Sequence, residues 1–146
     1  LGLAPAGAWL GIVGDDLGWT AITGWHWYPT IFWICLGVMF WIAAFDLNYA
    51  LMDMDSDREH GIHSFPAKFG EMHTLRTSIQ FTLLWFACFA IANPIDEITF
   101  LAAALMMCII NIGVILSQNK MKDFQKSFFY TSVATGWILL GGLMAA

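Results

Sequence analysis

The sequence predicts an all-α membrane protein: an antiparallel bundle of about five transmembrane helices that forms a single domain over residues 1–146. Hydrophobic residues make up 59% of the 146 positions and charged residues only 12%, about half the charged share of a soluble domain. Several apolar stretches reach the ~20 residues that a helix needs to cross a hydrocarbon core. Helices are expected because they satisfy their own backbone hydrogen bonds in lipid, and no period-2 pattern typical of a membrane barrel occurs.

Five apolar segments are expected to form the spans. The first is "LGLAPAGAWLGIVG", and it lacks the basic leader of a signal peptide. Four further segments of near 20 residues follow, at roughly 30–52, 75–93, 97–117 and 127–146. Because the chain opens directly on one apolar stretch and stops within another, we expect it to be part of a longer protein.

The basic residues predict the orientation of these spans. All six Lys and Arg lie in two connecting segments and are Arg58, Lys68, Arg76, Lys120, Lys122 and Lys126. The connections "DDLGWTAITGWHWYP" and "NPIDE" carry only acidic charge. By the positive-inside rule, residues 53–76 and 118–126 should share the cytosolic face. Alternation of spans joined by short loops places these two segments on one side independently of charge.

Two classes of function are disfavoured by composition. The three cysteines, Cys35, Cys88 and Cys108, lie within apolar runs at spacings that match no metal or redox motif, so we expect small buried side chains. The net charge is -5 and no basic stripe occurs. Nucleic acid is therefore not expected as a partner.

The candidate functional residues lie in "FDLNYALMDMDSDREHGIHSFPAKFG", residues 45–70. If the helix that starts near residue 30 continues through this stretch, positions can be compared at about 100° per residue. Three carboxylates and a phenol then share one face, each within about 60° of Asp46, and they belong to Asp46, Tyr49, Asp53 and Asp57. Asp55 falls on the opposite side.

A row of carboxylates without a cation would repel itself, which favours a bound divalent ion. All-oxygen ligation suits Mg²⁺, which typically takes one or two carboxylates together with substrate phosphates and water. The alternative is a solvated acidic helix end. Asp46 favours the metal site, because it follows sixteen mainly apolar residues and an ionisable group at membrane depth marks a cavity or pathway.

Basic and imidazole groups follow the acidic row, at Arg58, His60, His63 and Lys68. Cations that face a metal-binding row would suit the far side of a diphosphate. The alternative for the cations is the positive-inside bias. The two histidines could also be zinc ligands, although a pair three residues apart in a loop specifies little.

The pattern Asp46-x-x-Tyr49-x-x-x-Asp53-x-x-x-Asp57, followed by "GIHSFPAKFG", resembles the second aspartate-rich motif of the UbiA superfamily of intramembrane prenyltransferases. It is most similar to the branch that contains 4-hydroxybenzoate polyprenyltransferase and its menaquinone-pathway relatives. The stretches "LGLAPAGAWLGI" and "SFFYTS" also resemble that branch. One departure is Ser132, where the branch often has Asn.

A larger departure is the absence of the family's first Asn/Asp-rich motif. Asp15 and Asp16 precede the second motif, but they are adjacent to each other and belong to the opposite side. The resemblance therefore covers the second half of a larger UbiA-type bundle. It implies that the N-terminal half of the same protein, or a partner chain, supplies the first motif, and that this segment alone is inactive.

The resemblance implies a Mg²⁺-dependent transfer of a polyprenyl chain from polyprenyl diphosphate to an aromatic acceptor such as 4-hydroxybenzoate, in ubiquinone or menaquinone biosynthesis. Asp53 and Asp57 would hold the metal. Asp46 and Tyr49 would be the catalytic pair that positions metal or substrate. Lys68 and Arg58 would bind the diphosphate. The expected location is the lipid bilayer of a bacterial inner membrane, with the active face toward the cytosol.

Two other functions stay open. A non-catalytic structural membrane subunit of a larger complex is favoured by the missing first motif and disfavoured by the intact second motif. An ion or proton transporter that uses Asp46 would need a cationic partner in the neighbouring spans, and the sequence supplies none there.

Overall fold

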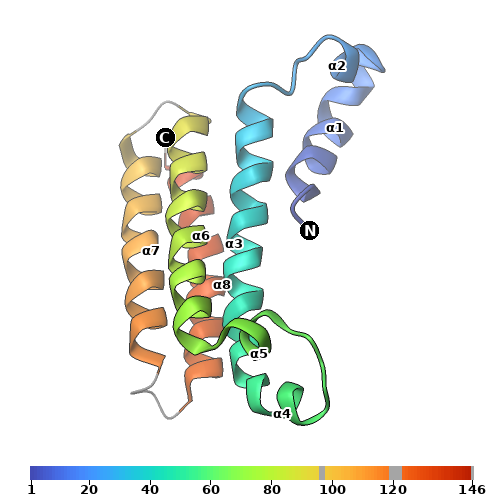
Figure 1. The fold of residues 1–146 in the computed structure, drawn as a ribbon. Coiled ribbons are helices and arrows are strands. Elements are labelled where there is room, and N and C mark those ends of the chain that lie inside the picture. Colours follow the sequence, from blue (N-terminus) through green and yellow to red (C-terminus); the bar gives the residue numbers. More distant parts are fainter. Residues whose placement is uncertain (96–97, 119–122, 146) are drawn as a thin grey trace.

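The computed structural model describes residues 1–95, 98–118 and 123–145 (Figure 1). These residues form helices and turns, and no strand occurs among them. The helices are α1 (Ala4–Leu17), α2 (Thr20–Thr23), α3 (Thr30–Met52), α4 (Met54–Glu59), α5 (Phe65–Phe69), α6 (Glu71–Ala92), α7 (Ile98–Ser117) and α8 (Phe124–Met144). The predicted all-α class is confirmed.

Four of these helices, α3, α6, α7 and α8, are long and apolar enough to cross a membrane, with 20 to 23 residues each. Figure 1 shows them side by side with alternating directions, which confirms the predicted antiparallel bundle. The first predicted span forms α1, a helix of only 14 residues, about 21 Å long. In Figure 1, α1 lies against α3 on the side away from α7.

The most extensive helix contact in the bundle is between α3 and α6, and glycine permits their approach. A Cβ built on Gly37 would lie 2.6 Å from the Cε1 atom of Phe89 and 3.2 Å from Cβ of Cys88. Small residues at such crossings let two helix backbones come together in lipid, where packing rather than water exclusion drives association. The α3–α6 pair is therefore the rigid base on which the connection between them is built.

The apolar core lies between α6, α7 and α8. Its buried members are Trp85, Phe89, Phe100, Ala104, Met107, Cys108 and Leu139. All three cysteines are free and buried, as the sequence predicted. Interdigitated apolar side chains of this kind fix how neighbouring helices sit against each other.

Two buried polar contacts join the helices in pairs. The Asn48 amide of α3 donates hydrogen bonds to Ser78 Oγ of α6 and, at 2.7 Å, to the Ala44 carbonyl. The Asn111 amide of α7 donates to Thr135 Oγ1 of α8 at 2.9 Å. Such side-chain hydrogen bonds help to hold helices together within a membrane.

The connection between α3 and α6 lies at the same end of the bundle as the start of α8 (Figure 1). Arg58 and Lys68 belong to this connection, and Lys126 lies in the first turn of α8. Lys120 and Lys122 lie outside the described residues. The described basic residues of both predicted segments thus occur at one end, as the alternation of spans requires.

Candidate functional site

The acidic row is divided by a break between two helices. α3 ends at Met52, Asp53 has a non-helical backbone (φ −95°, ψ 2°), and α4 begins at Met54. The expectation of one continuous helix through Asp57 was therefore wrong, and the angles derived for Asp53 and Asp57 do not hold. Aspartate competes with the helix backbone for hydrogen bonds and favours helix ends, and "MDMDSD" contains three in six residues.

The segment beyond the break encloses a charged cleft of about 550 Å³. Its lining residues are Asp57, Arg58, Gly61, Ile62, His63, Ala67 and Lys68. Three of the six predicted site residues thus share one cavity: the carboxylate of Asp57 and the two cations, Arg58 and Lys68. A cleft with both signs of charge can bind a phosphate-bearing group directly through its cations and through a metal ion on its carboxylate.

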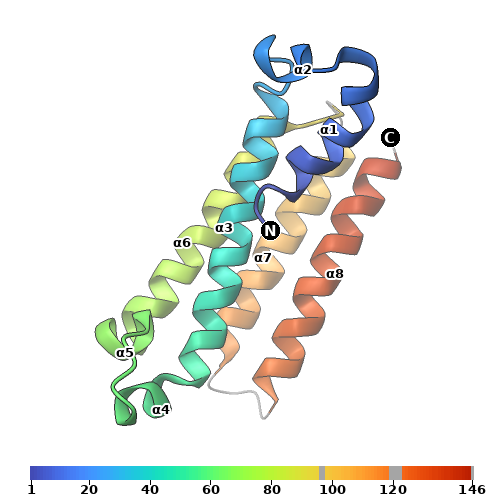
Figure 2. The same cartoon turned by 90° about the vertical axis from the view of Figure 1, so that its right-hand side faces the viewer.

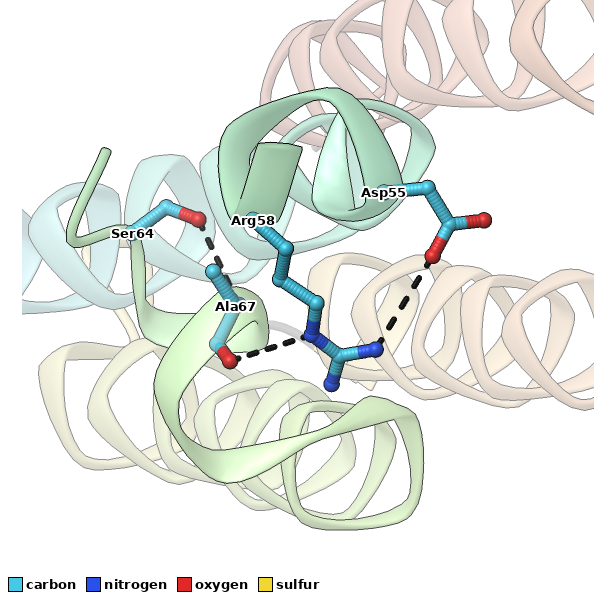
Figure 3. Close-up of polar contacts among 4 residues, drawn as sticks. All are labelled: Asp55, Arg58, Ser64 and Ala67. Carbon is cyan, nitrogen blue, oxygen red and sulfur yellow. Dashed lines mark hydrogen bonds and ion pairs between the residues drawn. The ribbon is translucent and has the colours of Figure 1, made fainter. Parts of the chain in front are cut away.

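The Arg58 side chain lies between Ala67 of α5 and Asp55 of α4 (Figure 3). Its Nε donates to the Ala67 carbonyl at 3.2 Å, and its Nη1 lies 3.8 Å from Oδ1 of Asp55. The Asp55 side chain is 93% exposed, so this ion pair adds little stability. The backbone contact is therefore the one that ties α4 to α5 and directs the guanidinium.

The turn from α4 to α5 is shaped by local chemistry. Gly61 has φ +67°, a left-handed conformation that glycine adopts without steric cost. Ser64 caps α5, where its Oγ accepts a hydrogen bond from the Ala67 N–H at 3.4 Å. Lys68 lies in the last turn of α5, with its ammonium 5.3 Å from the Phe69 ring. The chain thereby returns toward α4 and places both cations along one cavity.

A second cavity, here the apolar cleft, lies deeper in the bundle between α3 and α8. Its volume is about 300 Å³, and it is lined by Leu1, Val38, Trp41, Ile42, Phe45, Asp46 and Ser132. Asp46 lies six residues before the end of α3, about 9 Å along the helix axis. In Figure 2, α3 and α8 run antiparallel with α7 behind them. The structure thus places Asp46 and Asp57 in different cavities.

Tyr49 belongs to an aromatic column between α3 and α8. Its ring centroid lies 4.5 Å from that of Phe45 and 6.1 Å from that of Phe128, and Phe45 and Phe128 are stacked at 5.2 Å. Asp53 is solvent-exposed at the helix break and lines neither cleft. Of the six predicted residues, three line the charged cleft and one lines the apolar cleft.

The residues present fit a Mg²⁺ ion bound mainly by substrate. Within residues 1–95, 98–118 and 123–145, no group of three or more His, Cys, Asp or Glu is placed to hold a metal. The Asp57 carboxylate in the charged cleft matches the mode in which Mg²⁺ takes one or two carboxylates and completes its shell with phosphate oxygens and water. The donor set therefore fits magnesium better than zinc, which takes three or four protein ligands from Cys, His, Asp and Glu.

Ser132 lines a cavity in the structure, although the sequence gives no strong indication of such a role. Ser132 lines the apolar cleft opposite Asp46, and its buried Oγ has no hydrogen-bond partner among the described residues. The signal available in the sequence was a serine within an apolar span. Its place opposite Asp46 depends on how α8 packs against α3, which no local pattern gives.

Comparison with known proteins adds a family match. Residues 4–133 match the model of the UbiA prenyltransferase family. No solved structure matches the chain significantly.

Two curated proteins are similar at low identity. The chain is 26% identical over 134 residues to a 4-hydroxybenzoate solanesyltransferase from Synechocystis sp., a match that covers 88% of this chain and 45% of the relative. It is 25% identical over 109 residues to a 4-hydroxybenzoate octaprenyltransferase from Polynucleobacter necessarius subsp. necessarius, covering 72% of this chain and 38% of the relative. The chain thus spans less than half the length of either protein.

Proposed function

Because the chain belongs to the UbiA prenyltransferase family, we propose that it forms part of an enzyme that transfers a polyprenyl chain from its diphosphate to an aromatic acceptor such as 4-hydroxybenzoate. The observation that supports this most is the occurrence of a charged cleft beside α4 and α5 together with an apolar cleft along the middle of α3. The charged cleft holds Asp57, Arg58 and Lys68, and the apolar cleft holds Asp46. Such a pair suits a reaction that joins a donor with a charged diphosphate to a compact, mainly apolar acceptor.

In the proposed reaction, the bond between the prenyl C1 atom and the diphosphate oxygen breaks, a bond forms between C1 and a ring carbon, and the ring loses a proton. Arg58 and Lys68 bind oxygens of the leaving diphosphate and stabilise the charge that develops there. Asp53 and Asp57 are the proposed ligands of Mg²⁺, which when bound supplies further neutralisation of the leaving group. Asp46 and Tyr49 are the proposed positioning groups deeper in the bundle.

The proposed setting is a multi-pass protein of a bacterial inner membrane, with the charged cleft toward the cytosol. The described basic residues Arg58, Lys68 and Lys126 lie at this end of the bundle, which supports that orientation. The proposed partner is the half of the enzyme that corresponds to the uncovered part of the relatives, on the same or another chain. It would carry the family's first aspartate-rich motif.

A structural membrane subunit is the second candidate. A subunit without catalytic function would keep the helix bundle and would not depend on the chemistry of the charged cleft.

The test is prenyl transfer by the complete gene product in detergent or bilayers, with Mg²⁺, a polyprenyl diphosphate and 4-hydroxybenzoate. Asp57→Asn should lower kcat/KM by at least ~10², the usual loss when a charge-stabilising group at a reacting centre is removed. Asp55→Asn is the matched control and should stay within about threefold, because that side chain is 93% exposed outside the cleft. An unmodified protein that is inactive with several donors and acceptors would favour the structural subunit.

A further inference from the structure

Ser132 differs from the two threonines on α8. Thr131 donates to the Ser127 carbonyl at 2.9 Å, and Thr135 donates to the Thr131 carbonyl at 2.8 Å. These are the ordinary bonds of a helix hydroxyl to the preceding turn. The Ser132 Oγ is buried and has no such partner among the described residues. An unpaired buried hydroxyl is unfavourable, which makes it a candidate to bind something that the chain itself does not provide.

The cavity beside Ser132 has the properties of a small-molecule site. Its walls are the apolar and aromatic side chains of Val38, Trp41, Ile42 and Phe45, and its volume of about 300 Å³ is at the lower end of the range for ligand pockets. The two polar side chains in its lining, Asp46 and Ser132, come from different helices. An apolar cavity with few converging polar groups binds a compact, mainly apolar ligand and orients it.

The two polar groups are chemically complementary to a hydroxyl group. An ionised carboxylate only accepts hydrogen bonds, whereas a serine hydroxyl can donate. Rotation of Ser132 about χ1 to face the cavity breaks no hydrogen bond to a described residue. A phenolic hydroxyl donates one hydrogen bond and accepts others, so it would satisfy both side chains at once. A carboxylate on the same ring would be repelled by Asp46 and would point outward.

We infer that the apolar cleft binds the aromatic acceptor, with the acceptor's phenolic hydroxyl held between the Asp46 carboxylate and the Ser132 hydroxyl. The ring packs against Trp41 and Phe45. The ligand class is a small phenol, and Ser132 is the residue that selects for its hydroxyl group. This inference rests on the proposed function, because it assigns the acceptor position of that reaction.

The experiment measures equilibrium binding of radiolabelled 4-hydroxybenzoate and benzoate to the complete gene product, and separately measures prenyl transfer. Ser132→Ala should weaken binding of 4-hydroxybenzoate about 3- to 10-fold, the value of one neutral hydrogen bond. Binding of benzoate, which lacks the hydroxyl, should not change. The matched control is Ser127→Ala on the same helix, which keeps the Thr131 bond because that bond uses the Ser127 backbone carbonyl. It should leave both ligands unaffected.

The possible results separate the two proposals. Loss of hydroxyl selectivity in Ser132→Ala without prenyl transfer by the unmodified protein would support the acceptor site and overturn the transferase. Two other results would overturn the acceptor site while prenyl transfer by the unmodified protein leaves the transferase proposal standing. In the first, Ser132→Ala weakens binding of 4-hydroxybenzoate and of benzoate by the same factor. In the second, Ser127→Ala weakens binding of 4-hydroxybenzoate as much as Ser132→Ala does. If the unmodified protein binds neither 4-hydroxybenzoate nor benzoate, the acceptor site is overturned. Unchanged elution on size-exclusion chromatography confirms that each variant is folded.

Discussion

At the scale of single residues, neighbouring aspartates in one short stretch have different environments. Asp57 is partly buried and lines the charged cleft, whereas Asp53 is exposed where α3 ends. Asp55 is paired with Arg58 outside the cleft. The helix break, and not the spacing alone, decides which carboxylate reaches which cavity.

Asp53 permits a test that separates metal binding from folding. Its side chain makes no capping hydrogen bond to α4, and the junction is held by backbone contacts such as the Asp57 N–H to the Asp53 carbonyl at 2.8 Å. Asp53→Ala should therefore keep the helix content of the complete protein, while prenyl transfer falls by at least ~10². Circular dichroism and turnover at several Mg²⁺ concentrations measure the two effects. Full activity of Asp53→Ala would remove Asp53 from the proposed metal site.

The sequence predicted which residue types form the site better than it predicted their arrangement. Arg58, Lys68 and Asp57 do line one cavity, because they lie in one short connection that folds back at Gly61. The division between Asp46 and Asp57 was missed, since the helical angles assumed a continuous helix. Tyr49 packs against the Phe128 ring of α8. These residues are 79 positions apart in sequence, and helical periodicity does not predict a contact over such a separation.

At the scale of helices, the spans were predictable and their pairings were not. Apolar length alone located the four long helices to within a few residues. The contacts of α3 with α6 and of α7 with α8 depend on single small or polar residues: Gly37 at one crossing, and Asn48 and Asn111 as hydrogen-bond donors. These residues carry no periodic signal, so sequence reasoning passed over them.

The α3–α6 crossing yields a stability prediction. Gly37→Ala would place a methyl group 2.6 Å from the Phe89 ring, and such overpacking costs about 1–3 kcal/mol of folding free energy. The matched control is Gly113→Ala on α7, where a Cβ meets nothing within 4 Å. Because alanine has a higher helix propensity than glycine, this substitution should stabilise the protein slightly. The apparent melting temperature in detergent should fall by several degrees for Gly37→Ala alone. Equal melting temperatures for both variants would contradict the close crossing.

At the scale of the whole molecule, the bundle has one end that carries the charged cleft with Arg58 and Lys68 and another that is rich in tryptophan. α4, α5 and the start of α8 lie at the first end, and α2 with its flanking aromatic residues lies at the second (Figure 1). Trp25, Trp27 and Tyr28 pack together there, with centroid distances of 5.3 to 6.5 Å. Aromatic clusters of this kind favour the headgroup level of a bilayer.

The difference between the two ends of the bundle predicts the result of accessibility labelling. Single cysteines at Lys68 and Lys126 should react with an impermeant maleimide from the same side of intact inverted vesicles, and a cysteine at Thr23 should react only from the other side. The native cysteines are 2 to 6% exposed, so background labelling should be low. Reaction of positions 68 and 126 from opposite sides would overturn the arrangement of spans.

The separation of the two cavities has a consequence for how products would depart. A diphosphate released into the charged cleft would enter the aqueous phase, whereas a ring with a polyprenyl chain would partition into the bilayer. The helix end at Asp53 therefore marks a partition boundary, and the two halves of a cleaved substrate would leave into different phases. Rebinding of one product next to the other would be rare, because each is diluted into a compartment that the other cannot enter.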